Sequence, residues 1–221
     1  MADMTVDEAI AKYGPSELTQ DDLLVLDDPG YTEENVAIVT GGGSGIGRSP
    51  ALAFAANGLT VIAADIDEKG LEQVRSEAEA LALSGEVVPI TANLTSDADL
   101  ERIVETAADH GSIRYLINNA GIQHVAPIES FPLEKYNQMH EIMLRAPLAL
   151  TKHCLPHFRD REDGRGVVGN MCSVHGHTVT RDKVAYNTLK FGLRGLTQSI
   201  AAEGHLNGGD MTHEGGMSLT Y

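Results

Sequence analysis

Apolar residues gather in short runs that alternate with longer stretches in which they recur every three or four positions. The first run, 36–40, is rich in β-branched residues and ends in glycines, as expected of a buried parallel strand. Four similar runs follow, and amphipathic helical stretches lie between and after them. The pattern predicts strands at 36–40, 60–65, 86–91, 113–118 and 166–172, and helices at 46–57, 68–83, 97–109, 133–158 and 185–203.

Alternating strands and helices imply right-handed crossovers, so we expect an α/β fold with a doubly wound parallel sheet. A chain of 221 residues suits a single domain with one sizeable core. Residues 1–35 are rich in acids and contain Pro15, Pro29 and Gly30 as breakers. We therefore expect an acidic N-terminal extension over 1–35, packed on or tethered to a main domain over 36–221.

The chain is strongly acidic, with 32 Asp and Glu against 16 Lys and Arg and a formal net charge of -16. Such a surface repels phosphate backbones, which argues against nucleic acid as a partner. Acid excess with few lysines is typical of a halophilic protein, and an ordinary acidic cytosolic enzyme is the alternative. We find no apolar run long enough to span a membrane and no basic leader, so we expect a soluble, cytoplasmic protein.

The cysteines and histidines do not predict a metal centre. Cys154 and Cys172 have neither metal-ligand spacing nor a partner cluster, so reduced packing residues are the simplest interpretation. The nine histidines are scattered without a ligand motif, and we predict no metal.

A glycine-rich turn over 41–47 follows the first predicted strand. Glycines there let the backbone approach a pyrophosphate, which then meets the positive end of the next helix. Asp65 ends the second strand, where a carboxylate can bind both ribose hydroxyls; a helix cap is the alternative. A carboxylate also repels a 2′-phosphate, so NAD is favoured over NADP. Pro50 falls inside the first helix and is expected to kink it.

A second group of residues has the chemistry of a proton-transfer site. Tyr186 and Lys190 are four residues apart, so on a helix they share one face. The ammonium would favour the ionised phenol and bring the pKa of Tyr186 toward neutrality. Ser173 adds a hydroxyl thirteen residues before Tyr186. Tyr-x-x-x-Lys alone is commonly a surface pair, but the glycine turn and Ser173 favour a catalytic role.

These motifs, with Asn118-Asn119-Ala120-Gly121 between them, resemble those of the short-chain dehydrogenase/reductase family. The resemblance covers 36–203 and implies a Rossmann fold and an oxidoreductase acting on CH-OH groups. It implies that Tyr186 is the acid/base, that Lys190 binds the nicotinamide ribose, and that Ser173 binds the substrate oxygen. The implied cofactor contacts are Gly41, Ser44, Gly45, Ile46, Gly47, Asp65, Asn93, Leu94, Asn119, Ala120, Gly121, Tyr186 and Lys190.

Within the family, residues 121–129 and 173–176 resemble D-3-hydroxybutyrate dehydrogenases. This implies a small hydroxy acid substrate, oxidised from 3-hydroxybutyrate to acetoacetate, with Gln123, His175 and Lys183 holding its carboxylate. Each of the three also has a structural alternative: Gln123 could cap a strand end, His175 could brace its loop, and Lys183 could be solvated. Asn93 stands where the family usually has an acid at the adenine amino group, and its side-chain carbonyl can accept that hydrogen bond.

Two departures from the family pattern stand out. Met143 occupies the position of an asparagine that orders a relay water, which a thioether cannot do well. After 201–204 the family continues into a sixth strand and a substrate lid, whereas here 205–221 resembles the family's last strand. We interpret this as an internal deletion, with a divergent terminus as the alternative. We expect the tail to pair with the vacated sheet edge.

Two further functions stay open beside the leading interpretation. The chain could be a dehydrogenase for another small alcohol or sugar, because one family fold serves many substrates. It could also be a non-catalytic dinucleotide-binding protein, which Met143 and the missing lid favour. The helices at 133–158 and 185–203 correspond to the family's oligomer contacts, so we expect a dimer or tetramer.

Overall fold

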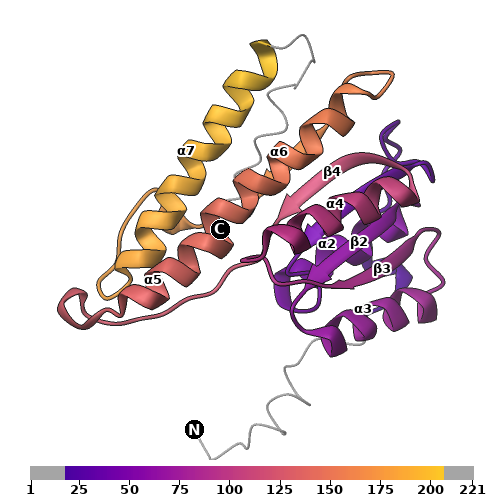
Figure 1. The fold of residues 1–221 in the computed structure, drawn as a ribbon. Coiled ribbons are helices and arrows are strands. Elements are labelled where there is room, and N and C mark those ends of the chain that lie inside the picture. Colours follow the sequence, from indigo (N-terminus) through magenta and orange to yellow (C-terminus); the bar gives the residue numbers. More distant parts are fainter. Residues whose placement is uncertain (1–17, 207–221) are drawn as a thin grey trace, which may run out of the picture.

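The computed structural model describes residues 18–206, which form an α/β domain around one parallel sheet (Figure 1). Five strands lie in the order β3-β2-β1-β4-β5, and every neighbouring pair is parallel. Their bounds are β1 Asn35–Thr40, β2 Thr60–Asp65, β3 Glu86–Thr91, β4 Ser112–Asn118 and β5 Val167–Asn170. The predicted fold class is confirmed, and all five predicted strands are present.

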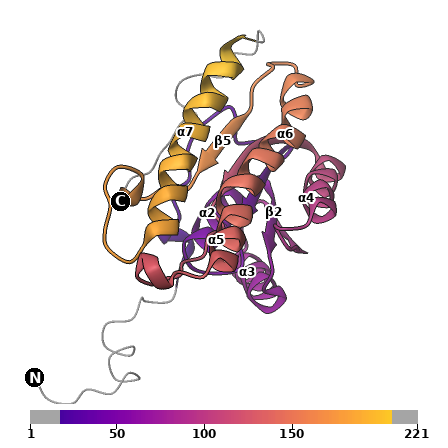
Figure 2. The same cartoon turned by 60° about the vertical axis from the view of Figure 1, so that its left-hand side comes forward.

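Helices cover both faces of the sheet (Figure 2). Alternate residues of β1 show this directly. Val36 and Ile38 pack with one group of helices, α4 and α6, whereas Ala37 and Val39 pack with the other group, α2 and α3. All six residues of β1 are buried, as a central parallel strand requires. The bounds are α2 Gly45–Ala56, α3 Glu68–Ala80, α4 Asp97–His110, α5 Leu133–His140, α6 Ala146–Arg159 and α7 Val184–Leu206.

The predicted helix over 133–158 is interrupted. A π-helical turn, η3 Glu141–Arg145, separates α5 from α6, and the backbone N–H of Ala146 donates to the carbonyl of Glu141. Pro147, near the start of α6, has no N–H for the carbonyl of Met143, so a regular α-helical ladder cannot run through this point. Pro50, by contrast, leaves α2 assigned as one continuous helix, and the prediction of a kink gains no support.

The described part of the N-terminal extension packs on the domain. Short η1 (Gln20–Asp22) precedes an extended segment, and Gln20 donates through its amide to the carbonyls of Leu81 and Ala82, just after α3. Asn57, just after α2, accepts from the N–H of Leu26 and donates to the carbonyl of Leu24. The Tyr31 ring meets Phe54 edge-on, with centroids 6.1 Å apart, and Tyr115 at a tilt, with centroids 5.7 Å apart.

β5 lies at one edge of the sheet, and among residues 18–206 its outer side has no strand partner. The predicted last strand over 205–221 begins inside α7, which runs to Leu206, and its remaining residues, 207–221, lie outside the described part together with the expected pairing of the tail with this edge. No helix in the described part is both long and apolar enough to cross a membrane.

Candidate active site

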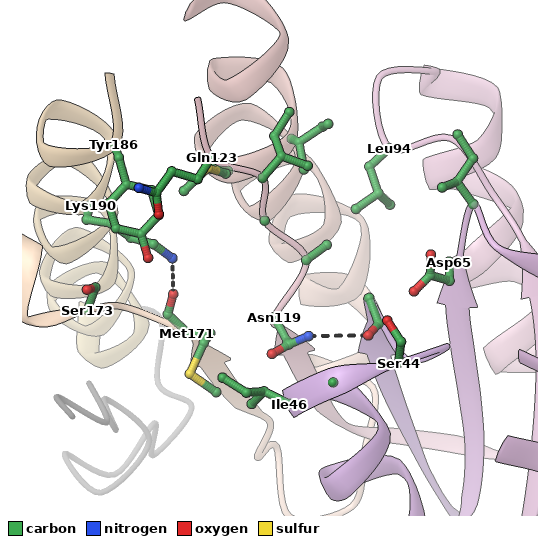
Figure 3. A pocket seen from close by; sticks show the side chains of 18 of the residues that line it. Ser44, Ile46, Asp65, Leu94, Asn119, Gln123, Met171, Ser173, Tyr186 and Lys190 are labelled. Atoms are coloured by element: carbon green, nitrogen blue, oxygen red, sulfur yellow. Dashed lines mark hydrogen bonds between the residues drawn. The ribbon is translucent and has the colours of Figure 1, made fainter. Parts of the chain in front are cut away.

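A cleft of about 620 Å³ opens at the carboxyl ends of the strands (Figure 3). In a parallel sheet the strand ends meet along one edge, which gathers residues from distant parts of the sequence. The predicted residues that line it are Gly41, Ser44, Gly45, Ile46, Asp65, Asn93, Leu94, Asn119, Ala120, Gly121, Gln123, Ser173, Tyr186 and Lys190. Gly47, His175 and Lys183 were also predicted, but they are not among the lining residues.

The turn over 41–47 is built so that α2 packs directly against it. Gly41 and Gly45 have positive φ of 67° and 53°, a region that favours glycine. A Cβ at Gly47 would lie 2.7 Å from the carbonyl carbon of Gly41, and closer still to its oxygen. Gly47 thus serves helix packing rather than ligand contact. The first N–H groups of α2 lack intrahelical acceptors and give this end of the cleft a positive potential.

Thr40 and Asn119 fasten this turn to the end of β4. Asn119 donates through its side chain to the carbonyls of Thr40, at 3.0 Å, and Gly41, at 3.4 Å. The Thr40 hydroxyl in turn accepts from the backbone N–H groups of Asn119 and Ala120. These bonds hold the ends of β1 and β4 at a fixed spacing beside the cleft.

Asp65 ends β2 with its carboxylate at the cleft. One oxygen accepts from the N–H of Gly43 at 3.0 Å and the other from the N–H of Asp67 at 3.1 Å. Each oxygen keeps a further lone pair, so the carboxylate can still accept from hydroxyl donors of a ligand. The N-cap of α3 is Asp67, and Asp65 accepts from no N–H of that helix, so the geometry is compatible with the binding role and gives the capping alternative no support.

The side-chain oxygen of Asn93 makes different hydrogen bonds from the one that the sequence suggested. Its side-chain oxygen accepts from both the N–H and the hydroxyl of Thr95, at 3.1 and 2.9 Å. Its backbone N–H donates to Asp99, and the bonds to Arg102 and Asn93 lower the pKa of Asp99. Because both lone pairs of the amide oxygen are used, acceptance from an adenine amino group would require this turn to rearrange.

Ser173, Tyr186 and Lys190 come together at the other end of the cleft. Tyr186 and Lys190 lie on successive turns of α7, and the Lys190 nitrogen is 5.6 Å from the centre of the Tyr186 ring. That nitrogen donates to the backbone carbonyl of Met171, just after β5. Ser173 follows two residues later and lines the same wall (Figure 3). The structure therefore places all three predicted catalytic side chains in one cleft.

Lys190 is the buried cation of the site, only 4% exposed. Burial lowers its pKa, because removal from water disfavours the charged form, and the neighbouring Cys172 partly opposes this shift. Its ammonium is partly compensated by the hydrogen bond to Met171, and no carboxylate among the described residues forms a salt bridge with it. Such a group favours negative charge on anything placed beside it.

The three residues predicted to hold a carboxylate are not brought together. Gln123 lines the cleft, but both ring nitrogens of His175 are engaged, by Ser173 at 3.2 Å and by Thr180 at 3.0 Å. Lys183 does not line the cleft and lies just before the first turn of α7. Met143 lines the cleft beneath Gly121 and is 1% exposed, in the middle of the π-helical turn.

In the described part of the chain no group of three or more His, Cys, Asp or Glu side chains could hold a metal ion. Cys154 and Cys172 are both buried and free. The charged side chains among the described residues that line the cleft are Asp65 and Lys190, and the start of α2 adds a positive potential.

The sequence profile of the family described as short chain dehydrogenase matches residues 35–208. The chain belongs to the short-chain dehydrogenase family. Its similarity extends to an uncharacterized oxidoreductase of Bacillus subtilis strain 168, YxjF, at 36% identity over 79% of this chain and 67% of that protein. A D-beta-hydroxybutyrate dehydrogenase of Cupriavidus necator is 34% identical over 76% of this chain and 64% of its own length.

A solved structure of levodione reductase has the same architecture, with a TM-score of 0.73 and 33% sequence identity. That match covers 78% of this chain and 67% of the levodione reductase chain. The chain thus spans about two thirds of the length of these relatives. Members of this short-chain dehydrogenase family typically bind a nicotinamide dinucleotide, NAD or NADP, and act as oxidoreductases on CH-OH groups.

Several residues that shape the site of this short-chain dehydrogenase were not singled out from its sequence. Thr40 orders the glycine turn, and the carbonyl of Met171 anchors Lys190. A signal for Thr40 was available, because it is the last residue of a buried strand. Nothing in the sequence marked Met171, because the contact is made by its backbone carbonyl, which every residue has. Apolar walls are supplied by Ile66, Ala92, Ile122 and Ile142.

Proposed function

We propose that this protein transfers hydride between NAD and a small hydroxy acid, interconverting 3-hydroxybutyrate and acetoacetate. The observation that carries the proposal is a single cleft with Asp65 at one end and Ser173, Tyr186 and Lys190 at the other. A dinucleotide needs a donor-rich turn for phosphate and an acceptor for ribose, and a hydroxy acid needs a proton acceptor beside its carbinol. The cleft offers each of these in sequence along its length.

The residues present fit a nicotinamide dinucleotide. The glycine turn and the first N–H groups of α2 would meet the pyrophosphate, and Asp65 would accept from the adenosine ribose hydroxyls. A carboxylate at this place repels a 2′-phosphate, which supports NAD over NADP. Lys190 would donate to the second ribose. The bound cofactor supplies the hydride acceptor, and the remaining chemistry belongs to the protein.

The protein's own part is to hold the alcohol oxygen and remove its proton. Ser173 would hydrogen-bond that oxygen, and Tyr186 would take the hydroxyl proton on its phenol oxygen. Lys190 places a cation 5.6 Å from the Tyr186 ring centre, which stabilises negative charge on the phenol oxygen during the transfer. The apolar wall formed in part by Ile122 and Ile142 would keep water from the reacting carbon.

The choice of substrate rests on Gln123 and on relatedness. Gln123 lines the cleft next to the catalytic residues and can donate to a carboxylate. The Cupriavidus necator relative carries the name of this activity at 34% identity. His175 and Lys183 would have to move to join Gln123, so we propose Gln123 as the residue that meets the carboxylate before any such change.

The test is NADH formation at 340 nm from D-3-hydroxybutyrate, with NAD and with NADP, in low and molar salt, beside NAD binding by calorimetry. We expect turnover with NAD, and at least a hundredfold loss of kcat in Tyr186→Phe with nearly unchanged NAD affinity. Asp65→Asn should weaken NAD binding by roughly tenfold, as expected for lost charged hydrogen bonds. Activity retained in Tyr186→Phe would disprove the assigned acid/base.

A non-catalytic dinucleotide-binding role is the second candidate. Met143 supports it, because it lines the cleft where the family resemblance implies an asparagine. NAD binding without turnover of any hydroxy acid or small alcohol would select this role. Met143→Asn would then be the first variant to assay for a gain of activity.

We further propose that the protein forms a homo-oligomer in the cytoplasm. α6 and α7 present a largely apolar groove of about 310 Å³ that includes Leu148, Leu155, Leu196 and Ile200. A second copy is the proposed occupant, by analogy with the family. Light scattering should give at least a dimer, and Leu148→Glu should weaken it, because a charge there would be buried. A reducing compartment suits the free cysteines in the described part.

A further inference from the structure

The hydroxyl of Ser173 is held from behind by the loop that follows it. Ser173 caps the short helix η4 (Val174–Gly176), and its Oγ accepts from the backbone N–H of His175 at 3.2 Å. The imidazole of the same residue turns back, so that its Nδ1 also lies 3.2 Å from Ser173 Oγ. One residue therefore meets the serine oxygen with both its backbone and its ring.

The ring itself is fixed on its other sides. Its Nε2 lies 3.0 Å from the hydroxyl of Thr180. Thr180 is tied to α7, because its carbonyl accepts from the side chain of the buried Asn187 at 2.9 Å. The ring also meets the Tyr186 ring edge-on, with centroids 5.4 Å apart and planes at 77°. The imidazole is thus held between the catalytic serine, the catalytic tyrosine and the loop.

Two hydrogen-bond arrangements are consistent with these distances. If Ser173 donates to Nδ1, its hydrogen points at the ring and only a lone pair faces the cleft. If Nδ1–H donates to Ser173, the ring and the His175 backbone N–H fill both lone pairs of Oγ, and the serine hydrogen must point elsewhere. In the second arrangement Thr180 donates its hydroxyl hydrogen to Nε2.

The substrate oxygen distinguishes the two arrangements. A ketone oxygen only accepts hydrogen bonds, so Ser173 can bind it only by donating. The second arrangement leaves the serine hydrogen free for this purpose. It also prevents Ser173 from accepting the alcohol proton in the reverse direction, which leaves Tyr186 as the acceptor.

We propose that His175 is a positioning residue: its Nδ1–H tautomer, with Nε2 paired to Thr180, aims the Ser173 hydroxyl hydrogen at the substrate oxygen. The statement about catalysis rests on the proposed dehydrogenase function; the tautomer itself does not. The proposal replaces the carboxylate-binding role expected for His175, because both its ring nitrogens are already engaged within the fold. It also gives Thr180 and Asn187 a role in holding the His175 ring, although neither takes part in the proposed reaction.

The direct test is ¹⁵N NMR of the histidine ring nitrogens at about pH 8, where free imidazole is neutral. The His175 signals are identified by their loss in His175→Asn. We expect a protonated Nδ1 and an unprotonated Nε2, and in Thr180→Val a shift toward the Nε2–H form. A wild-type ring protonated at Nε2 would overturn the proposal, and this readout needs no turnover.

The kinetic test compares two amides at position 175 in acetoacetate reduction. An asparagine amide nitrogen stands close to where Nδ1 does, whereas the longer glutamine places its amide near Nε2. We expect His175→Gln to lower kcat by roughly ten- to hundredfold with little change in KM, and His175→Asn to recover most of that loss. His177→Gln is the matched control, because His177 is exposed on the same loop.

The possible failures are distinguishable. If the wild-type protein turns over no substrate, the proposed function fails, and the ring spectrum still decides the tautomer. If it turns over while His175→Gln matches the wild-type kcat, or His175→Asn is no better than His175→Gln, the positioning role fails and the dehydrogenase function stands.

Discussion

Alanine substitutions at three glycines should change stability in different ways, because each glycine is present for a different reason. A Cβ at Gly47 would overlap the backbone of Gly41 and the side-chain nitrogen of Asn119. Neither neighbour can rotate away, so the turn or α2 must shift. Overpacking of this kind costs about 1–3 kcal/mol, and weakening the Asn119 hydrogen bonds adds roughly 1 kcal/mol. We expect Gly47→Ala to lose about 3 kcal/mol of unfolding free energy.

Gly45 and Gly195 provide the matched controls. A Cβ at Gly45 meets nothing within 4 Å, but its φ of 53° is strained for alanine, so Gly45→Ala should cost roughly 1 kcal/mol. Gly195 lies exposed inside α7, and a Cβ there also meets nothing within 4 Å. Gly195→Ala should gain about 1 kcal/mol from helix propensity alone.

Urea unfolding followed by far-UV circular dichroism, without cofactor, measures all three free energies, since the chain has no tryptophan for fluorescence. For a domain of this size each kcal/mol should shift Tm by about 2–4 °C. The order Gly195→Ala, wild type, Gly45→Ala, Gly47→Ala in falling stability is the expected result. A Gly47→Ala protein within about 0.5 kcal/mol of wild type would refute the close packing of α2 on the turn.

Three more predictions concern single sites away from the turn. Ala82 has φ 49° just after α3, so Ala82→Gly should stabilise the protein by about 1 kcal/mol in thermal unfolding; a loss would contradict the assigned strain. Burial raises the pKa of Cys154 to about 12, so a thiol reagent at pH 8 should label it only after unfolding in urea. Burial lowers the pKa of Lys190, so the unfolded chain binds its proton where the folded chain does not. Wild-type stability should therefore rise with pH between the lowered pKa and about 10.4, and Lys190→Met should lack this rise; parallel curves would exclude it.

The parts of the fold that sequence predicts well are those set by local pattern. The strand Thr60–Asp65 was predicted at its observed bounds, because its β-branched run is buried and ends at a carboxylate. Gly41 and Asp65 line the cleft, where strand ends fix their position, and their contacts with a cofactor stay a prediction. Periodicity did not reveal the π-helical turn at Met143, because its side chains continue the apolar face of the helix. The sequence feature that could have revealed the π-helical turn is Pro147, which has no backbone N–H to donate.

Side-chain partners were less predictable than positions. His175 and Lys183 were expected to meet Gln123, but this required loops far apart in sequence to converge, and no periodic pattern fixes loop geometry. The hydrogen bonds from Thr95 to the Asn93 side chain were equally hard to predict, because polar loop residues often bond to one another locally.

Residues 18–26 are joined to the domain by side-chain amides and by the partly buried Leu18 and Leu23, which pack against the core, and not by a backbone ladder. Gln20 binds the backbone just after α3, and Asn57 binds the backbone of Leu24 and Leu26. Each such bond contributes roughly 1 kcal/mol net, far below the free energy of about 5–15 kcal/mol that holds a whole domain together. The segment can therefore detach as a unit of local opening, and its amide hydrogens should exchange with solvent long before those of β1. A protease that cuts there would trim the chain and leave the cleft at the opposite ends of the helices intact.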